Sequence, residues 1–153
     1  MANIYLSSTL LWNGSMEEIF DMVFQSGLDG IELWSQQFFY RKFDIDEFEK
    51  LAALYPLKNC IHSQSWDLNI SSVNDGIRKQ FVTEVKKSVE LAYQLGLDEV
   101  TVHPGHCTIS GIGVSYGAYL KESLREILEY AQKWKIDVSL EIMEKIPNIH
   151  TVR

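Results

Sequence analysis

The 153-residue chain is the size of one globular domain, and its 46% hydrophobic content allows a sizeable core. The net charge of −7 disfavours nonspecific binding to nucleic acid or anionic membranes. No stretch has the roughly 18 apolar residues of a membrane span, and the first residues lack the basic start of a secretory signal. Two cysteines are too few for a disulfide scaffold. We expect one cytoplasmic domain, residues 1–153.

In the first third of the chain, short aliphatic runs alternate with amphipathic stretches. Residues 4–6 predict a strand, and residues 15–25 predict a helix with an acidic first turn and Gly27 after its end. Residues 30–34 predict a second strand. Residues 46–55 predict a second helix, closed by Pro56.

The same alternation continues to the end of the chain. Strands are predicted at residues 58–61, 99–102 and 137–140, with helices at residues 74–95 and 115–135. Strands separated by helices of this length imply parallel βαβ units. A Gly-Leu-Asp sequence, at residues 27–29 and 96–98, precedes the second and fourth strands, and its glycine allows a left-handed turn. This repeat fits a barrel as well as an open sheet.

Three metal-competent side chains follow successive strands. His62, His103 and Glu141 stand at or just past the predicted ends of the third, fourth and fifth strands. In a parallel α/β protein these ends open onto one face, where substrates bind. Two imidazoles and a carboxylate suit Zn, Mn, Co or Fe. The alternatives are that each histidine is structural, or that a closed zinc site forms from Cys60, His62, His103, His106 and Cys107.

The strand-end motifs resemble those of the xylose-isomerase-like TIM barrel superfamily, which includes sugar isomerases, epimerases and endonuclease-four-type enzymes. The resembling segments are Gly-Ile-Glu-Leu-Trp at 30–34, Ile-His-Ser at 61–63, His-Pro-Gly-His at 103–106 and Leu-Glu-Ile-Met at 140–143. The resemblance implies an α/β parallel (β/α) barrel. It also implies that His62 and His103 are ligands of a divalent metal and that Glu141 is a metal-binding, catalytic glutamate. Glu32 matches a strand-two carboxylate whose role varies in the superfamily.

TIM barrels have eight units and about 250 residues, whereas this chain provides about five units. Residues 151–152 look like the start of a further helix, and His150 is not expected to be a ligand. A five-unit sheet has open edges, so we expect either a truncated chain or pairing with another chain, as in a homo-oligomer.

Several other residues are expected near the same face. Trp12, Trp34 and Trp66 follow the first three strands, where they either stack on a sugar or cover the core. His106 is a further substrate-binding candidate. The aromatic residues 38–40 lie in a predicted loop that is either packed or a lid. Residues 110–117 form a glycine-rich loop that could cover the site or hold a phosphate, although a plain flexible loop is preferred.

Three functions remain open. The first is a metal-dependent isomerase or epimerase of a small sugar or sugar phosphate, favoured by the acidic charge and the tryptophans. The second is an endonuclease-four-type phosphodiesterase acting on abasic DNA, favoured by the pair of His62 and His103. The third is a non-catalytic fragment.

Overall fold

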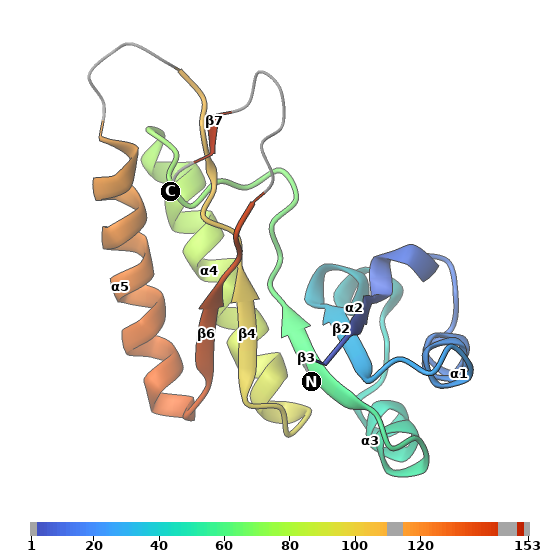
Figure 1. Cartoon of the computed structure of the whole chain (residues 1–153). Coiled ribbons are helices and arrows are strands. Elements are labelled where there is room, and N and C mark those ends of the chain that lie inside the picture. Colours follow the sequence, from blue (N-terminus) through green and yellow to red (C-terminus); the bar gives the residue numbers. More distant parts are fainter. Residues whose placement is uncertain (1–2, 110–114, 144–149, 152–153) are drawn as a thin grey trace.

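The computed structural model describes residues 3–109, 115–143 and 150–151. Five parallel strands form a curved sheet in the order β1-β2-β3-β4-β6 (Figure 1). These strands are β1 (Tyr5–Ser7), β2 (Gly30–Trp34), β3 (Lys58–His62), β4 (Glu99–Val102) and β6 (Asp137–Leu140). The helices between them are α1 (Met16–Gln25), α3 (Ile45–Leu54), α4 (Asp75–Gln94) and α5 (Tyr116–Trp134). Within this sheet, strands that follow one another along the chain are neighbours, as the βαβ pattern predicts.

Local capping explains where the helices begin and end. Ser15 precedes α1, its hydroxyl accepts a hydrogen bond from the Glu18 N–H at 3.1 Å, and the Glu18 carboxylate accepts one from the Ser15 N–H at 2.7 Å. This reciprocal pair satisfies two N–H groups that the helix leaves free. Gly27 and Gly96 both have φ of 67°, which confirms the left-handed turns predicted from the repeat.

Side chains alternate between the two faces of the sheet. Ile31, Leu33, Ile61, Val100 and Val102 are buried between the sheet and the helices. Because successive strand residues point to opposite faces, Glu32, Cys60, Thr101 and Ser139 lie on the other, inner face. The register pairs Glu32 with Cys60 and Thr101 with Ser139. The apolar core is thus outside the curved sheet, and the inner face is polar.

Two short elements depart from the predictions. The aromatic residues 38–40 belong to a helix, α2 (Ser35–Arg41), instead of a loop, because Phe38 packs into the core. Two two-residue strands, β5 (His106–Cys107) and β7 (His150–Thr151), pair in antiparallel fashion. Thr151 is therefore in a strand, and the expected helix start at residues 151–152 was wrong; Val152 lies outside the described residues. A short 3-10 helix, η1 (Ser8–Leu11), follows β1.

The sheet has two open edges. Within residues 3–109, 115–143 and 150–151, β1 and β6 each have one neighbouring strand. Beside β6 is an open groove whose apolar residues are Leu124, Leu128, Ile136 and Val138. Leu128 is 50% exposed. None of the described helices combines the length and apolarity that a bilayer span requires.

Candidate metal centre

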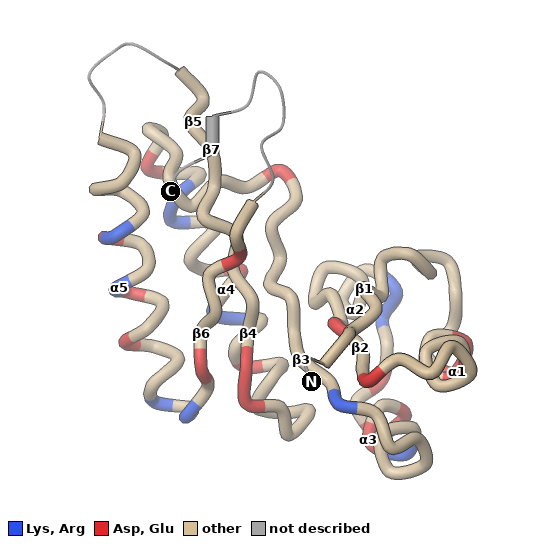
Figure 2. Tube along the Cα trace, in the orientation of Figure 1, with Lys and Arg blue, Asp and Glu red and all other residues tan. Residues whose placement is uncertain are grey.

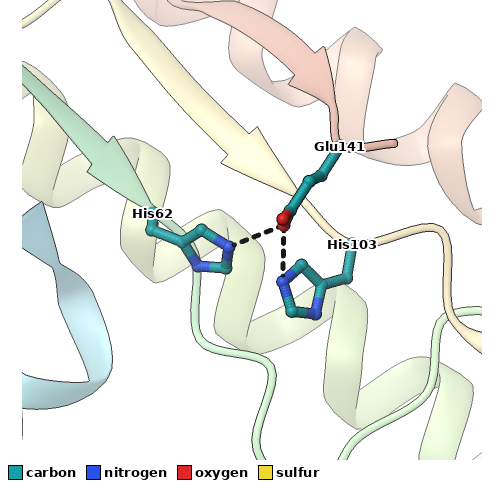
Figure 3. Close-up of side chains that lie close together, drawn as sticks. All are labelled: His62, His103 and Glu141. Atoms are coloured by element: carbon teal, nitrogen blue, oxygen red, sulfur yellow. Dashed lines mark hydrogen bonds and ion pairs between the residues drawn. The ribbon is translucent and has the colours of Figure 1, made fainter. Parts of the chain in front are cut away.

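His62, His103 and Glu141 meet at the carboxyl ends of three neighbouring strands (Figure 3). His62 ends β3, His103 directly follows β4, and Glu141 directly follows β6. Parallel pairing of β3 with β4 and of β4 with β6 brings these ends to one edge. One ligand atom from each residue lies within 4.8 Å of the other two. No other group of three His, Cys, Asp or Glu residues in the described part of the chain is arranged this way.

One carboxylate oxygen contacts both imidazoles. Glu141 Oε2 lies 2.7 Å from His103 Nε2 and 3.3 Å from His62 Nε2. The two rings are nearly perpendicular, with centroids 4.6 Å apart. The His62 side chain is almost fully buried, whereas the Glu141 side chain is 41% exposed. The centre is therefore anchored in the protein on the His62 side and accessible on the Glu141 side.

The main chain determines which nitrogen of His62 faces the centre. His62 Nδ1 lies 2.8 Å from the Ser63 carbonyl oxygen, which can only accept a hydrogen bond. The proton of the neutral ring therefore resides on Nδ1, and Nε2 carries an unprotonated lone pair that faces the centre. A hydrogen bond of this kind orients histidines that bind metals.

The surroundings of both imidazoles favour the neutral form. Burial lowers the pKa of His62, and the neighbouring His103 lowers it further. Burial also lowers the pKa of His103, against the opposing effect of the Glu141 carboxylate. A lowered pKa favours the uncharged ring at pH 7. The uncharged ring is the form that binds metal ions.

A tryptophan supports the buried histidine. The Trp34 indole stacks on the His62 ring with centroids 3.8 Å apart and an interplanar angle of 2°. The register of β2 and β3 places these two residues opposite each other. The edge of His103 also meets Trp34, at 6.0 Å between centroids. Trp34 therefore restricts the orientation of His62 at its position beside Glu141.

Glu32 lies on the inner face of the sheet, two residues before Trp34 on β2. Burial raises the pKa of Glu32, and the negative charge of Glu141 raises it further. A carboxyl group with a raised pKa can hold a proton closer to neutral pH than a free glutamate can. Because its pKa responds to the charge of Glu141, Glu32 is a second carboxyl group near the candidate metal centre.

The other predicted residues lie around this centre. Trp12 contacts Trp66, at 4.8 Å between ring centroids, and Trp66 contacts Trp34 at 5.8 Å. The three tryptophans therefore form one aromatic cluster, in which Trp66 is 46% exposed. His106 lies in β5, outside the group formed by His62, His103 and Glu141.

The closed zinc site considered from the sequence does not form in the described residues. Cys60 and Cys107 are both free, and neither belongs to the cluster of metal-competent groups. Cys60 lies two residues before His62 on the inner face, where burial and the charges of Glu32 and Glu99 raise its pKa to about 12. A thiol in this state is a poor metal ligand. In the glycine-rich loop, residues 110–114 lie outside the described residues.

Sequence reasoning missed the residues that connect the loops after β3 and β4. Asn69 Nδ2 donates to the His106 carbonyl at 2.8 Å, and the Ser71 hydroxyl donates to the Pro104 carbonyl at 2.7 Å. These contacts join positions more than 30 residues apart, so no local pattern reveals them. The only available signal was the density of serine and asparagine in residues 63–74.

Comparison with known proteins agrees with this architecture. The family model of the xylose isomerase-like TIM barrel matches residues 20–150. The uncharacterized protein MJ1188 of Methanocaldococcus jannaschii is 30% identical over 155 residues, which cover 97% of this chain and 57% of that protein. The chain thus spans little more than half the length of this relative.

Solved structures have the same fold. A D-tagatose 3-epimerase-like protein superposes with a TM-score of 0.75 and 24% identity, covering 95% of this chain and 54% of its own. The 3-keto-D-glucoside 4-epimerase of E. coli superposes with a TM-score of 0.77 and 15% identity, covering 92% and 56%. These matches confirm the predicted fold class, an incomplete parallel (β/α) barrel of about five of eight units. The chain belongs to the xylose isomerase-like TIM barrel family.

Proposed function

We propose that His62, His103 and Glu141 bind one divalent metal ion, and that the chain provides half of the site of a metal-dependent sugar or sugar-phosphate isomerase or epimerase. One observation carries the proposal. The lone pair of His62 Nε2 faces Glu141 Oε2 at 3.3 Å, although its own proton is committed to Ser63. A cation bound between these two acceptors would relieve the repulsion of their electron pairs. Nitrogen and carboxylate ligands together suit Zn, Mn or Co.

The residues of this chain have separate roles in the proposed chemistry. A divalent ion held here would polarise a carbonyl or hydroxyl oxygen of the substrate. Glu141 is the catalytic residue in the sense that it holds this ion on the accessible side of the centre. Glu32, whose pKa is raised, is suited to hold a proton that moves between adjacent carbons.

The aromatic cluster is suited to a sugar. Trp66, which is 46% exposed, lies between Trp12 and Trp34, and apolar C–H faces of sugars pack on such rings. His106 would contribute a polar contact. Epimerases of small sugars among the structural neighbours support this substrate class, although those proteins share at most 24% identity with the chain.

A phosphodiesterase of the endonuclease-four type is the second candidate. The presence of both His62 and His103 favours it. However, Figure 2 shows that the lysines and arginines of the described residues are dispersed mainly along the helices. Binding of a DNA backbone depends on such basic groups. We therefore do not propose nucleic acid as the partner.

We also propose that the 153-residue chain folds as one domain and pairs with a second copy through its open edges. The groove of Leu124, Leu128, Ile136 and Val138 lies beside the free edge of β6. Unpaired edges and exposed apolar surface of this kind favour association.

The proposal is tested by metal analysis followed by activity assays. Protein purified without chelator should contain about one equivalent of Zn, Mn or Co, and His103→Ala should lose most of it. His106→Ala is the matched control and should retain the metal. A panel of ketoses and an abasic-site DNA duplex then distinguish the two reactions. Equal metal content in both variants would refute the centre, whereas bound metal without turnover would support the non-catalytic alternative.

A further inference from the structure

The main chain around His62 is held by two buried serine hydroxyls. Ser35, the first residue of α2, donates to the His62 carbonyl at 3.0 Å. Ser88, in α4, accepts from the Gln64 N–H at 3.3 Å. The two hydroxyls lie 2.8 Å apart and are hydrogen-bonded to each other. The bonds therefore form a closed path that leaves the main chain at His62 and returns to it at Gln64, on either side of Ser63.

The hydrogens available in this path give it a direction. A hydroxyl has one hydrogen, and a carbonyl oxygen only accepts. Since Ser35 gives its hydrogen to His62, Ser88 donates in the bond between the two hydroxyls. The Ser88 hydroxyl also lies 3.0 Å from the Glu84 carbonyl, which competes for the same hydrogen. In either case the Ser88 oxygen accepts from the Gln64 N–H, and linked hydrogen bonds of this kind strengthen one another.

The same path controls the peptide group that orients the imidazole. The Ser63 carbonyl, which accepts from His62 Nδ1 at 2.8 Å, shares one peptide plane with the Gln64 N–H. Ser88 thus holds one end of a rigid unit whose other end fixes the proton of His62 on Nδ1. Rotation of this unit would release Nδ1, and the proton could then reside on Nε2 and be donated to Glu141 Oε2, 3.3 Å away. A proton on Nε2 would occupy the lone pair that a metal ion requires.

Packing alone does not account for a serine at position 88. Ser35 and Ser88 are both fully buried, so their hydroxyls have to find partners within the protein. Alanine is more favourable than serine in the interior of a helix and has no polar side-chain atom to bury. The Ser88 hydroxyl therefore serves the hydrogen bonds that it makes.

α4 fixes Gln64 through a second contact. Gln64 Nε2 donates to Glu84 Oε2 at 2.6 Å, and Glu84 lies one helical turn before Ser88. The helix thus holds both the side chain and the main chain of Gln64. Glu84 Oε1 in turn accepts from Gln80 at 2.7 Å and from Lys87 at 2.9 Å. The segment after β3 therefore rests on a rigid support.

We infer that Ser35 and Ser88 are positioning residues of the metal centre. Acting through the peptide group between residues 63 and 64, they keep the proton of His62 on Nδ1 and leave Nε2 free to bind a metal ion. The inference rests on the proposed function and adds two residues outside the ligand group. Ser35 directly follows Trp34, so adjacent residues supply the hydroxyl that binds the His62 carbonyl and the indole that stacks on its ring.

Zinc titration of the full chain against a competing chelator measures the effect on the centre. Ser88→Ala should weaken zinc binding about threefold to tenfold, at or below the lower end of the roughly 10–100-fold cost of losing a direct partner of a metal ligand. Ser35→Ala should have a similar effect, and the double variant should lose little more than either single variant, because each substitution interrupts the same path. Ser123→Ala is the matched control and should leave zinc affinity unchanged. Ser123 is also a buried helical serine, and its hydroxyl donates to the Ile70 carbonyl at 3.0 Å.

The tautomer of His62 provides a readout that does not depend on the metal. Long-range ¹H–¹⁵N NMR spectra of the metal-free chain at pH 8 distinguish a proton on Nδ1 from a proton on Nε2. The unmodified chain and Ser123→Ala should show the Nδ1–H form, whereas Ser88→Ala and Ser35→Ala should show a measurable fraction of the Nε2–H form. Circular dichroism identifies which variants are folded, and if Ser88→Ala is not, Ser35→Ala decides the question.

The outcomes separate this inference from the proposed function. An unmodified chain that binds no zinc would refute the metal centre, and the tautomer spectra would still decide the role of the two serines. Tight zinc binding that Ser35→Ala and Ser88→Ala leave unchanged, with the Nδ1–H form retained, would keep the centre and overturn the inference. Additive losses of zinc affinity in the double variant would also overturn it, because two independent contacts would then replace the single path.

Discussion

Replacement of Gly105 by alanine tests whether the loops after β3 and β4 are held together as the structure describes. The new Cβ would lie 2.3 Å from Asn69 Oδ1, 2.4 Å from Ser71 Oγ and 3.0 Å from Ile70 Cγ2. Separations below 3.0 Å force movement, and Asn69 and Ser71 cannot move without losing their bonds to His106 and Pro104, respectively. Gly105→Ala therefore combines backbone strain, overpacking and broken hydrogen bonds.

A second glycine separates the contribution of backbone strain from that of overpacking in the loss of unfolding free energy. A left-handed conformation costs a non-glycine residue about 1–2 kcal/mol. Gly96 has φ of 67° but has no atom within 4 Å of an added Cβ, so Gly96→Ala should lose only this amount. At Gly105, φ is 76°. Overpacking adds about 1–3 kcal/mol there, for a total of about 2–5 kcal/mol.

Urea denaturation followed by circular dichroism measures both variants against the unmodified chain. The free energy of unfolding should fall by at least about 1 kcal/mol more for Gly105→Ala than for Gly96→Ala, the minimum overpacking cost. Equal losses in the two variants would show that the loops are not in the contact described here.

Three further changes test other parts of the structure. Trp34→Leu removes the stack on His62 and should weaken zinc affinity about threefold to tenfold in a chelator competition assay, as expected for an aromatic pair worth about 0.5–1.5 kcal/mol. Trp12→Leu, which removes a ring in contact with Trp66, should leave zinc affinity unchanged, and equal effects of the two substitutions would contradict the positioning role of Trp34. Leu128→Asp should convert a dimer to a monomer in light scattering, whereas Leu54→Asp, at a 71% exposed position on α3, should not; a monomeric unmodified chain would refute the pairing. In a Cys107→Ser background, iodoacetamide should modify Cys60 far more slowly in native protein at pH 8 than in urea, because its pKa is raised to about 12 in the folded state; similar rates would exclude that environment.

The sequence predicted the sheet well because local pattern determines it. The predicted bounds of β2, β4 and β6 agree with the structure, since each is a short aliphatic run preceded by a turn. The same pattern placed His62, His103 and Glu141 at neighbouring strand ends. Their mutual proximity then follows from parallel pairing alone.

Features that depend on contacts between distant residues were not predictable in this way. The short helix α2 follows β2 without a capping side chain, and its aromatic residues resemble those of a buried loop. The pairing of β5 with β7 joins residues more than 40 positions apart through two-residue strands. The stack of Trp34 on His62 depends on the register between β2 and β3, which a strand pattern alone does not define.

X-ray absorption spectroscopy of the zinc-loaded chain tests the metal centre most directly. Two imidazoles and a carboxylate predict nitrogen and oxygen ligands at about 2.0–2.2 Å, with the multiple-scattering pattern of two histidines. His103→Ala should remove one imidazole from this pattern, and His106→Ala should leave it unchanged. A sulfur ligand at about 2.3 Å, or a spectrum without imidazole, would contradict the assignment of His62, His103 and Glu141.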